Sequence, residues 1–133
     1  MKELAWSSIL SVEIDEIDED HRRLVNLFNL LNHSIEAGDS EDYIESVLEE
    51  LIACTAWHFK HEERLMLKFN YDEFEQHKDE HQKLMNSSAG LLQKFLSQKK
   101  TLTSEDIDYI ETWLTEHILT TDMKLGVFLN TVM

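Results

Sequence analysis

The chain has 133 residues, a hydrophobic content of 42% and no proline, which suits one helical domain with one core. Twelve lysines and arginines stand against 27 aspartates and glutamates, for a formal net charge of −15. So acidic a surface repels nucleic-acid phosphates and anionic lipid headgroups, which makes both poor partners. No apolar run approaches the ~20 residues of a transmembrane helix, so we expect no membrane insertion.

The N-terminal segment and the cysteine content bear on the cellular compartment. Residues 1–12 carry one lysine, an early glutamate and only a short apolar stretch, which is not typical of a signal peptide. Cys54 is the single cysteine, so an internal disulfide is excluded and a reducing cytoplasm is favoured. We interpret Cys54 as a small core residue, and we expect a cytoplasmic protein that is a monomer.

The first elements expected are an N-terminal arm and a long helix. The arm carries Trp6, Ile9 and Val12. An acidic stretch then suits the start of a helix, because negative charge complements the helix dipole there. The following apolar residues have the spacing of one buried helical stripe: Leu24, Val25, Phe28, Leu31 and Ile35. Glycine commonly follows the last residue of a helix, so Gly38 is expected to mark the end of this one.

Three further helices follow with short connections. The second is expected to begin near Ser40 and to end before a turn at residues 70–72. The third runs from about Phe74 to a lysine-rich end at residues 98–100, and the fourth begins at Thr103, where Asp106 forms a weak capping-box match. Short loops favour antiparallel neighbours, so the sequence predicts an all-α, up-down-up-down four-helix bundle with the N-terminal arm and a short C-terminal helical segment.

Histidines lie on the apolar stripe of every expected helix. They share the helical spacing of nearby apolar residues: His21, His58, His77, His81 and His117. His33 is rotated by about 120° from His21 and is expected to face away, while His61 lies at the edge of its stripe. A single histidine on such a face is usually an ordinary core residue. Five buried imidazoles without partners would be costly, however, and a bound metal removes that cost.

The spacing of the candidate ligands indicates two metal ions. His77 and His81 are four residues apart, so they share a helix face, and His58 and Glu62 have the same spacing. Glu63 is rotated by about 140° from His58 and is expected to be solvated. Zinc normally takes four ligands, too few for five histidines and two carboxylates. Two octahedral irons accommodate them if both carboxylates and an oxo or hydroxo group bridge, which leaves one coordination position open.

His117 and Asp122 set a geometric condition on the fourth helix. They are five residues apart, and a regular helix would turn the carboxylate by about 140° away from the histidine. Thr120 and Thr121 lie between them and can compete for backbone hydrogen bonds. We therefore expect the helix to end, or to widen by one residue in the manner of a π-helix, between Ile118 and Asp122. A short segment from Met123 to Asn130 should follow, packed through its apolar residues Leu125 and Phe128.

These motifs resemble the hemerythrin and bacteriohemerythrin family. The matching residues are His21, the run from His58 to Glu62, the pair His77 and His81, and the pair His117 and Asp122. Flanking residues agree, among them Asp18, Met66 and Trp6. Asp72 is a departure, since many relatives have proline there. The resemblance spans roughly residues 6–130, and we expect residues 1–133 to form a single hemerythrin-like domain.

The resemblance implies a role for each ligand. His77, His81 and His117 would bind a six-coordinate iron, His21 and His58 would bind the iron with the open position, and Glu62 and Asp122 would bridge. The cofactor would be two non-haem iron ions with an oxo or hydroxo bridge, and dioxygen would be the ligand. Apolar residues are expected near the open position: Trp113, Leu114, Ile118 and Phe59. Ordinary core packing explains these four residues equally well.

The function expected from this resemblance is reversible dioxygen binding for carriage, storage or delivery, not enzymatic turnover. Five neutral imidazoles favour it, since oxygen-activating di-iron sites use mostly glutamates. An oxygen-consuming enzyme would be a suitable partner. Two alternatives stay open at this stage. One is oxygen or redox sensing through a separate partner, and the other is peroxide, nitric oxide or ferroxidase chemistry at the di-iron site.

Overall fold

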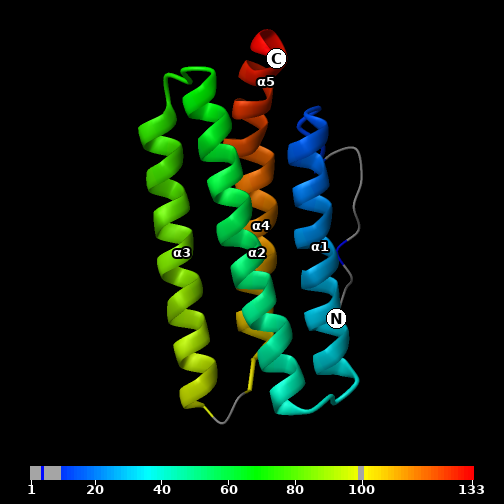
Figure 1. Ribbon diagram of the computed structural model, residues 1–133. Helices are drawn as coiled ribbons and strands as arrows, with labels where there is room; N and C mark the ends of the chain where they lie inside the picture. The colour runs from blue at the N-terminus through cyan, green and yellow to red at the C-terminus, as the bar shows by residue number, and fades with distance from the viewer. Residues whose placement is uncertain (1–3, 5–9, 99–100) are drawn as a thin grey trace.

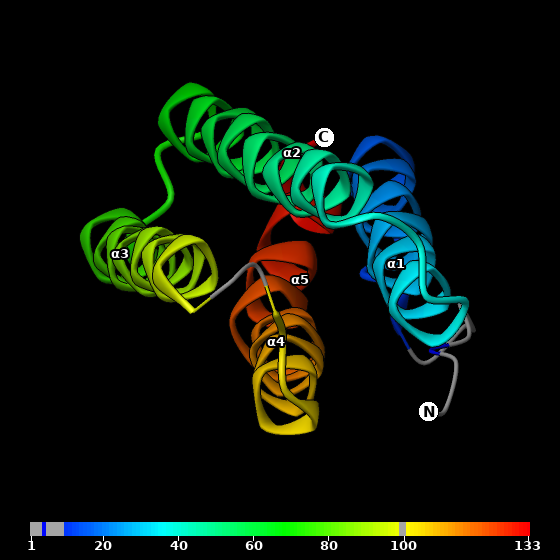
Figure 2. The same cartoon turned by 90° about the horizontal axis from the view of Figure 1, so that it is seen from below.

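The computed structural model describes residues 4, 10–98 and 101–133, and it confirms the all-α, up-down-up-down bundle. The described part of the chain contains no strand. Successive long helices run in opposite directions (Figure 1). Within the described residues, six elements follow one another: α1 (Asp15–Glu36), α2 (Glu41–Lys68), α3 (Phe74–Ser97), α4 (Ser104–His117), η2 (Ile118–Asp122) and α5 (Met123–Val132). Figure 2 shows the long helices placed around a common interior.

Local side-chain chemistry sets the ends of these helices as predicted. Gly38 follows α1 with a φ of 71°, a left-handed conformation that glycine adopts without strain. The Ser40 hydroxyl caps α2 by accepting a hydrogen bond from the backbone N–H of Tyr43 at 3.2 Å. Thr103 and Asp106 form the predicted capping box at the start of α4, each accepting from the other's backbone N–H. At the end of α3, residues 99–100 lie outside the described part of the chain.

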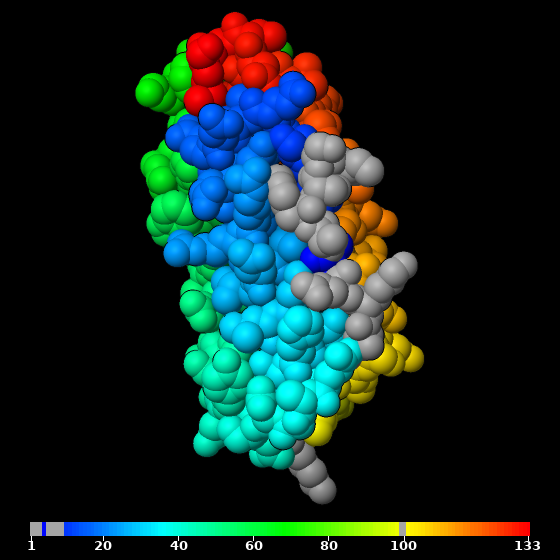
Figure 3. Space-filling view, turned by 90° about the vertical axis from the view of Figure 1, so that its right-hand side faces the viewer, coloured from blue at the N-terminus to red at the C-terminus, as the bar shows by residue number. Residues whose placement is uncertain are grey.

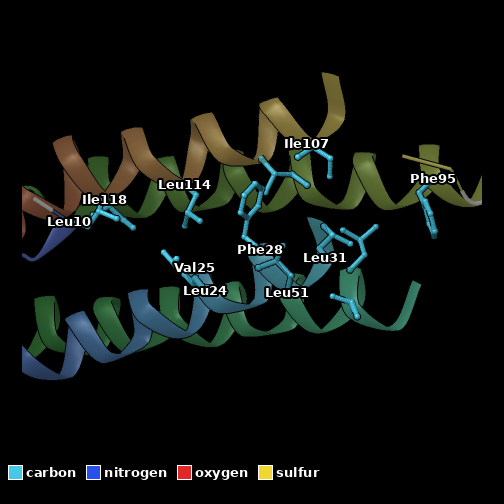
Figure 4. Packing of buried hydrophobic residues seen from close by; sticks show 13 residues of the cluster. Leu10, Leu24, Val25, Phe28, Leu31, Leu51, Phe95, Ile107, Leu114 and Ile118 are labelled. Atoms are coloured by element: carbon cyan, nitrogen blue, oxygen red, sulfur yellow. The ribbon is translucent and has the colours of Figure 1, made fainter. Parts of the chain in front are cut away.

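Two clusters of apolar side chains form the core. The larger one joins α1, α2, α3, α4 and η2. Figure 4 shows Leu114 and Ile118 facing Leu24, Val25 and Phe28 across the bundle. The smaller cluster lies around the start of α1, the end of α2 and α5, where Leu125 is fully buried and the Phe128 ring lies 4.9 Å from that of Tyr71. The C-terminal segment therefore packs through Leu125 and Phe128, as predicted. It continues from α4 in the same direction (Figure 1).

The arm before α1 is attached to the bundle by polar contacts. Asp18 is buried, and its carboxylate accepts hydrogen bonds from the backbone N–H of Val12 at 2.8 Å and from the Ser11 hydroxyl at 2.5 Å. In Figure 3 the dark blue residues before α1 lie against the red residues of α5. Gly126 makes this approach possible, because a Cβ there would lie 2.5 Å from the Val12 carbonyl oxygen. Trp6 and Ile9 lie outside the described residues.

None of the helices among the described residues is both long enough and apolar enough to span a bilayer.

Candidate metal centre

Five histidines from four helices meet in the interior of the bundle. All are at most 4% exposed: His21 on α1, His58 on α2, His77 and His81 on α3, and His117 on α4. Glu62 on α2 and Asp122 in η2 are fully buried among them. The ligand atoms form two groups, and within each group they lie within 4.8 Å of one another. We call them the three-histidine group (His77, His81, His117) and the two-histidine group (His21, His58); Glu62 and Asp122 belong to both.

Glu62 directs one carboxylate oxygen to each group. Its Oε1 lies 3.1 Å from Nε2 of His77 and 3.0 Å from Nε2 of His81. Its Oε2 lies 2.9 Å from Nε2 of His58 and 3.6 Å from Nε2 of His21. The spacing of four residues between His58 and Glu62 brings both side chains to the same face of α2, as the sequence predicts. Glu62 thus lies between the two groups.

Asp122 has the same divided arrangement because the helix widens before it. Its Oδ1 lies 3.0 Å from Nε2 of His117, and its Oδ2 lies 2.9 Å from Nε2 of His21. Residues 118–122 form the π-helical element η2, in which the backbone N–H of Met123 donates to the Ile118 carbonyl five residues earlier. The predicted π-type widening is confirmed. The Thr120 hydroxyl donates to the Glu116 carbonyl at 2.7 Å, the local competition that was expected there.

Three outer carboxylates bind the far side of these histidines. Each accepts a hydrogen bond from an Nδ1 on a neighbouring helix: Asp20 from His58 at 2.8 Å, Glu63 from His81 at 2.9 Å, and Glu80 from His117 at 2.5 Å. The expectation that Glu63 is solvated was wrong, since this residue is only 9% exposed. Its rotation away from His58 turns it toward α3, where His81 meets it.

The contacts of these histidines show which ring nitrogen carries the N–H and which is free to bind a metal ion. A neutral imidazole carries one N–H. In their neutral form, His58, His81 and His117, which donate through Nδ1, therefore present a bare lone pair at Nε2. Each of these lone pairs faces a carboxylate oxygen about 3 Å away. Lone pairs in such contact repel each other unless a proton or a cation lies between them.

The buried atoms without hydrogen bonds point to the same conclusion. Nε2 of His21, His58 and His117 and three oxygens of Glu62 and Asp122 have no hydrogen-bond partner among the described residues. Buried polar atoms of this kind are rare in proteins. Two ligands at right angles around one metal, each bound at ~2.1 Å, lie ~3.0 Å apart, which matches the contacts found here. The residues present therefore fit bound metal ions.

Without metal, protons must balance the buried carboxylates. Burial disfavours the charged imidazole of His58, but Glu62 and Asp20 outweigh it and raise the pKa of His58 to about 10. Burial is likewise outweighed at His77, where Asp122 and Glu62 raise the pKa to about 9. In the metal-free protein at neutral pH these two rings therefore carry a proton that a metal ion must displace.

The pKa values of the two inner carboxylates, Glu62 and Asp122, are shifted in the opposite direction, downwards. Burial raises the pKa of Glu62, but the neighbouring histidines, His58 foremost, hold it well below its ordinary value. For Asp122, burial and the charge of Glu62 raise the pKa, and contacts with His117 and His21 outweigh both and lower it. Both carboxylates are therefore ionised and able to bind a cation.

The four apolar residues expected near the open position lie around the cluster in different ways. Leu114 and Ile118 are buried in the larger core cluster, and Trp113 packs at its edge, partly buried. The Phe59 ring stacks on His81, with ring centroids 3.9 Å apart, and lies 5.4 Å from the His117 ring. Phe59 thus contacts mainly the three-histidine group, whereas Leu114 and Ile118 face α1, which carries His21 (Figure 4).

The residues outside the cluster agree with most expectations. His33 is exposed, as its rotation from His21 predicted. His61 lies at the edge of the stripe with a side chain 15% exposed. Cys54 is partly buried against the larger core cluster, and burial raises the pKa of its thiol, which suits a packing role.

Sequence reasoning did not identify the outer carboxylates Asp20, Glu63 and Glu80 as part of the site. One signal was available, because each is the immediate sequence neighbour of a candidate ligand: Asp20 precedes His21, Glu63 follows Glu62, and Glu80 precedes His81. That adjacency alone does not separate them from other acidic residues in so acidic a chain.

Comparison with known proteins adds the family. Residues 12–129 match the family model described as the hemerythrin HHE cation binding domain. The chain belongs to the hemerythrin family. It is 34% identical over 119 residues to a hemerythrin-like protein of Naegleria gruberi, which covers 90% of this chain and 87% of that protein. It is 32% identical over 120 residues to myohemerythrin-1 of Phascolopsis gouldii, with 90% and 88% covered.

Solved structures agree with the family assignment. A crystal structure of wild-type hemerythrin superimposes with a TM-score of 0.84 at 29% identity and covers 92% of this chain and 95% of that one. A variant of hemerythrin with one leucine replaced by tyrosine superimposes with a TM-score of 0.86 at 28% identity, with 95% and 96% covered. The bundle of this chain is therefore the hemerythrin bundle.

Proposed function

We propose that this chain binds dioxygen reversibly at a carboxylate-bridged centre of two non-haem irons, joined also by an oxo or hydroxo bridge. The observation that carries the proposal is the division of two buried carboxylates between two groups of histidines. Glu62 and Asp122 each direct one oxygen toward each group. A carboxylate that serves two metal ions needs this arrangement, and a site for one ion does not.

The ligand roles follow from the two groups. His77, His81 and His117 would hold one iron, His21 and His58 would hold the other, and Glu62 and Asp122 would bridge them. The second group has fewer histidines, so an iron held there would keep a coordination position for an external ligand. When bound, the two irons supply the two electrons that dioxygen takes up on binding and returns on release.

The surrounding residues favour binding over turnover. Leu114 and Ile118 pack on the side of α1, and we assign them, with Trp113, to the wall of the ligand pocket. Phe59 stacks on His81 and belongs to the apolar surroundings of the three-histidine group. Leu114, Ile118, Trp113 and Phe59 include no acid that could deliver a proton to bound dioxygen. We therefore propose that the chain is not an enzyme, and that it carries or stores oxygen or delivers it to an oxygen-consuming protein.

The test is metal analysis combined with an optical titration from anaerobic conditions to air. The proposal expects two irons per chain and a spectrum that cycles repeatedly between deoxygenated and oxygenated forms. Glu62→Gln should abolish the paired site, whereas Glu49→Gln, at an exposed position of the same helix, should preserve it. A single iron per chain would overturn the proposal. Irreversible oxidation with steady consumption of peroxide or nitric oxide would show that the chain is an enzyme and not an oxygen carrier.

A further inference from the structure

Asp20 is the only one of the three outer carboxylates that accepts hydrogen bonds from two imidazoles. Its Oδ2 lies 2.8 Å from Nδ1 of His58 and 2.6 Å from Nδ1 of His61. The acid is buried near the start of α1, and both histidines come from α2. Two ring nitrogens face this one oxygen, and hydrogen bonds of this kind favour the ionised carboxylate, so Asp20 is an anion.

His61 is not one of the assigned metal ligands, but three neighbouring side chains fix its position. Its side chain is 15% exposed, its Nε2 lies 3.7 Å from the Glu16 carboxylate, and its ring lies 5.5 Å from that of Trp57. With Nδ1 committed to Asp20, the ring is directed away from the metal cluster. Asp20 is therefore the contact that connects the His61 side chain to the cluster.

We propose that Asp20 and His61 form a positioning pair that sets the balance between ferrous and ferric states at the iron held by His21 and His58. This inference rests on the proposed function. Asp20 orients the His58 ring so that Nε2 faces the cluster. An anionic acceptor also makes a metal-bound imidazole a stronger donor, which favours the ferric state. The His61 N–H binds the same oxygen and withdraws part of that negative charge, so it opposes the effect of Asp20.

The other outer carboxylates provide the comparison. Glu63 binds Nδ1 of His81 and lies 3.6 Å from the exposed Lys60 ammonium, and Glu80 binds Nδ1 of His117 and accepts from the Thr121 hydroxyl at 2.7 Å. Both serve the three-histidine group, and neither has a second imidazole. The carboxylate that accepts hydrogen bonds from two imidazoles is thus found beside the iron that would exchange dioxygen, where control of the oxidation state matters most.

The experiment measures the midpoint potential of the iron-loaded protein by optical redox titration, together with the rate at which the oxygenated form oxidises irreversibly. Asp20→Asn removes the charge and should raise the potential, with iron affinity lowered by about 10–100-fold. His61→Leu removes the N–H and should lower the potential and speed irreversible oxidation. His61→Asn keeps an N–H at the same distance along the side chain and should restore the parent values.

A double variant tests whether the effect of His61 on the irons passes through Asp20. Because His61 acts through Asp20, His61→Leu should change nothing further in an Asp20→Asn background. His33→Leu, at an exposed position, is the control for loss of a histidine elsewhere. Shifts of the same sign in both single variants, no rescue by His61→Asn, or a full His61→Leu effect in the double variant would each overturn the pair. Failure of the parent to bind two irons would instead overturn the proposed function.

Discussion

The Glu80 carboxylate on α3 accepts a hydrogen bond of 2.5 Å from Nδ1 of His117 on α4. The same relation links α1 to α2 through Asp20 and α2 to α3 through Glu63. Each of these acids stands beside a candidate ligand in sequence, and neighbouring residues of a helix point about 100° apart. One residue of each adjacent pair therefore faces the centre while the other faces the next helix. The outer carboxylates thus tie each helix to the ligand of the following one.

This relation predicts that Glu80 is needed for tight binding of the metal. Glu80→Gln keeps the shape of the side chain but removes the charge, and the His117 hydrogen bond lowers the pKa of Glu80, so the parent residue is an anion. We expect iron affinity to fall by about 10–100-fold, measured by competition with a chelator. The neighbouring exposed residue gives the control, and Asp79→Asn should retain the parent affinity.

The ligand assignment predicts different effects for two histidines. His77→Ala removes one arm of a pair that binds the same ion, so most of the iron should be lost. His33→Ala should keep about two irons per chain, because His33 lies on the exposed face of α1. Mass-spectrometric analysis of iron per chain checks both results, and equal losses in the two variants would contradict the assignment.

The metal-free protein should be less stable than the loaded protein and should lose stability at alkaline pH. The pKa of His58 is about 10 and that of His77 about 9 in the folded chain, against an ordinary value of 6.5. Their protons stabilise the folded state fully below about pH 6.5, and this contribution is lost as the pH rises through 9 to 10. The loaded protein holds metal in place of these protons.

Chemical denaturation of both forms at about pH 7 and pH 10 measures this difference. The free energy of unfolding should fall with pH in the metal-free form and change much less in the loaded form. Equal free energies of unfolding for the two forms at neutral pH would contradict a buried metal site.

Gly126 should be essential for the contact between α5 and the arm. An alanine Cβ there would lie 2.5 Å from the Val12 carbonyl oxygen and 2.8 Å from its Cβ, so the arm would have to move. We expect Gly126→Ala to lower the free energy of unfolding by about 1–3 kcal/mol. Gly90→Ala meets no atom within 4 Å and should instead stabilise α3 by up to about 1 kcal/mol. Thermal denaturation of both variants distinguishes these outcomes.

Leu114 should protect the oxygenated form from water. The side chain is buried beside α1, so Leu114→Ala should cost about 2–5 kcal/mol of stability and open space for water and small anions. Irreversible oxidation, followed optically in air, should then be faster than in the parent. Leu119→Ala, at a position 41% exposed, serves as the control. An unchanged oxidation rate in Leu114→Ala would leave this residue a packing role only.

The sequence by itself determined much of the fold and the inner histidines. Capping residues such as Ser40 and Thr103 act within their own helix, and helical spacing places His77 and His81 on one face whatever lies opposite. The interval from His117 to Asp122 even required the widened turn that η2 provides. All of these features depend on local backbone geometry, which the order of residues specifies directly.

Only the tertiary structure decided which groups meet across helices. Spacing shows that Glu63 points away from His58, but it does not show that His81 on α3 lies there to donate a hydrogen bond. The division of the Glu62 oxygens between two groups likewise depends on how α1 and α3 pack against α2. Periodicity gives the direction of a side chain about its own helix axis. What that side chain contacts is set by the packing angle and register of the neighbouring helices, which no single segment contains.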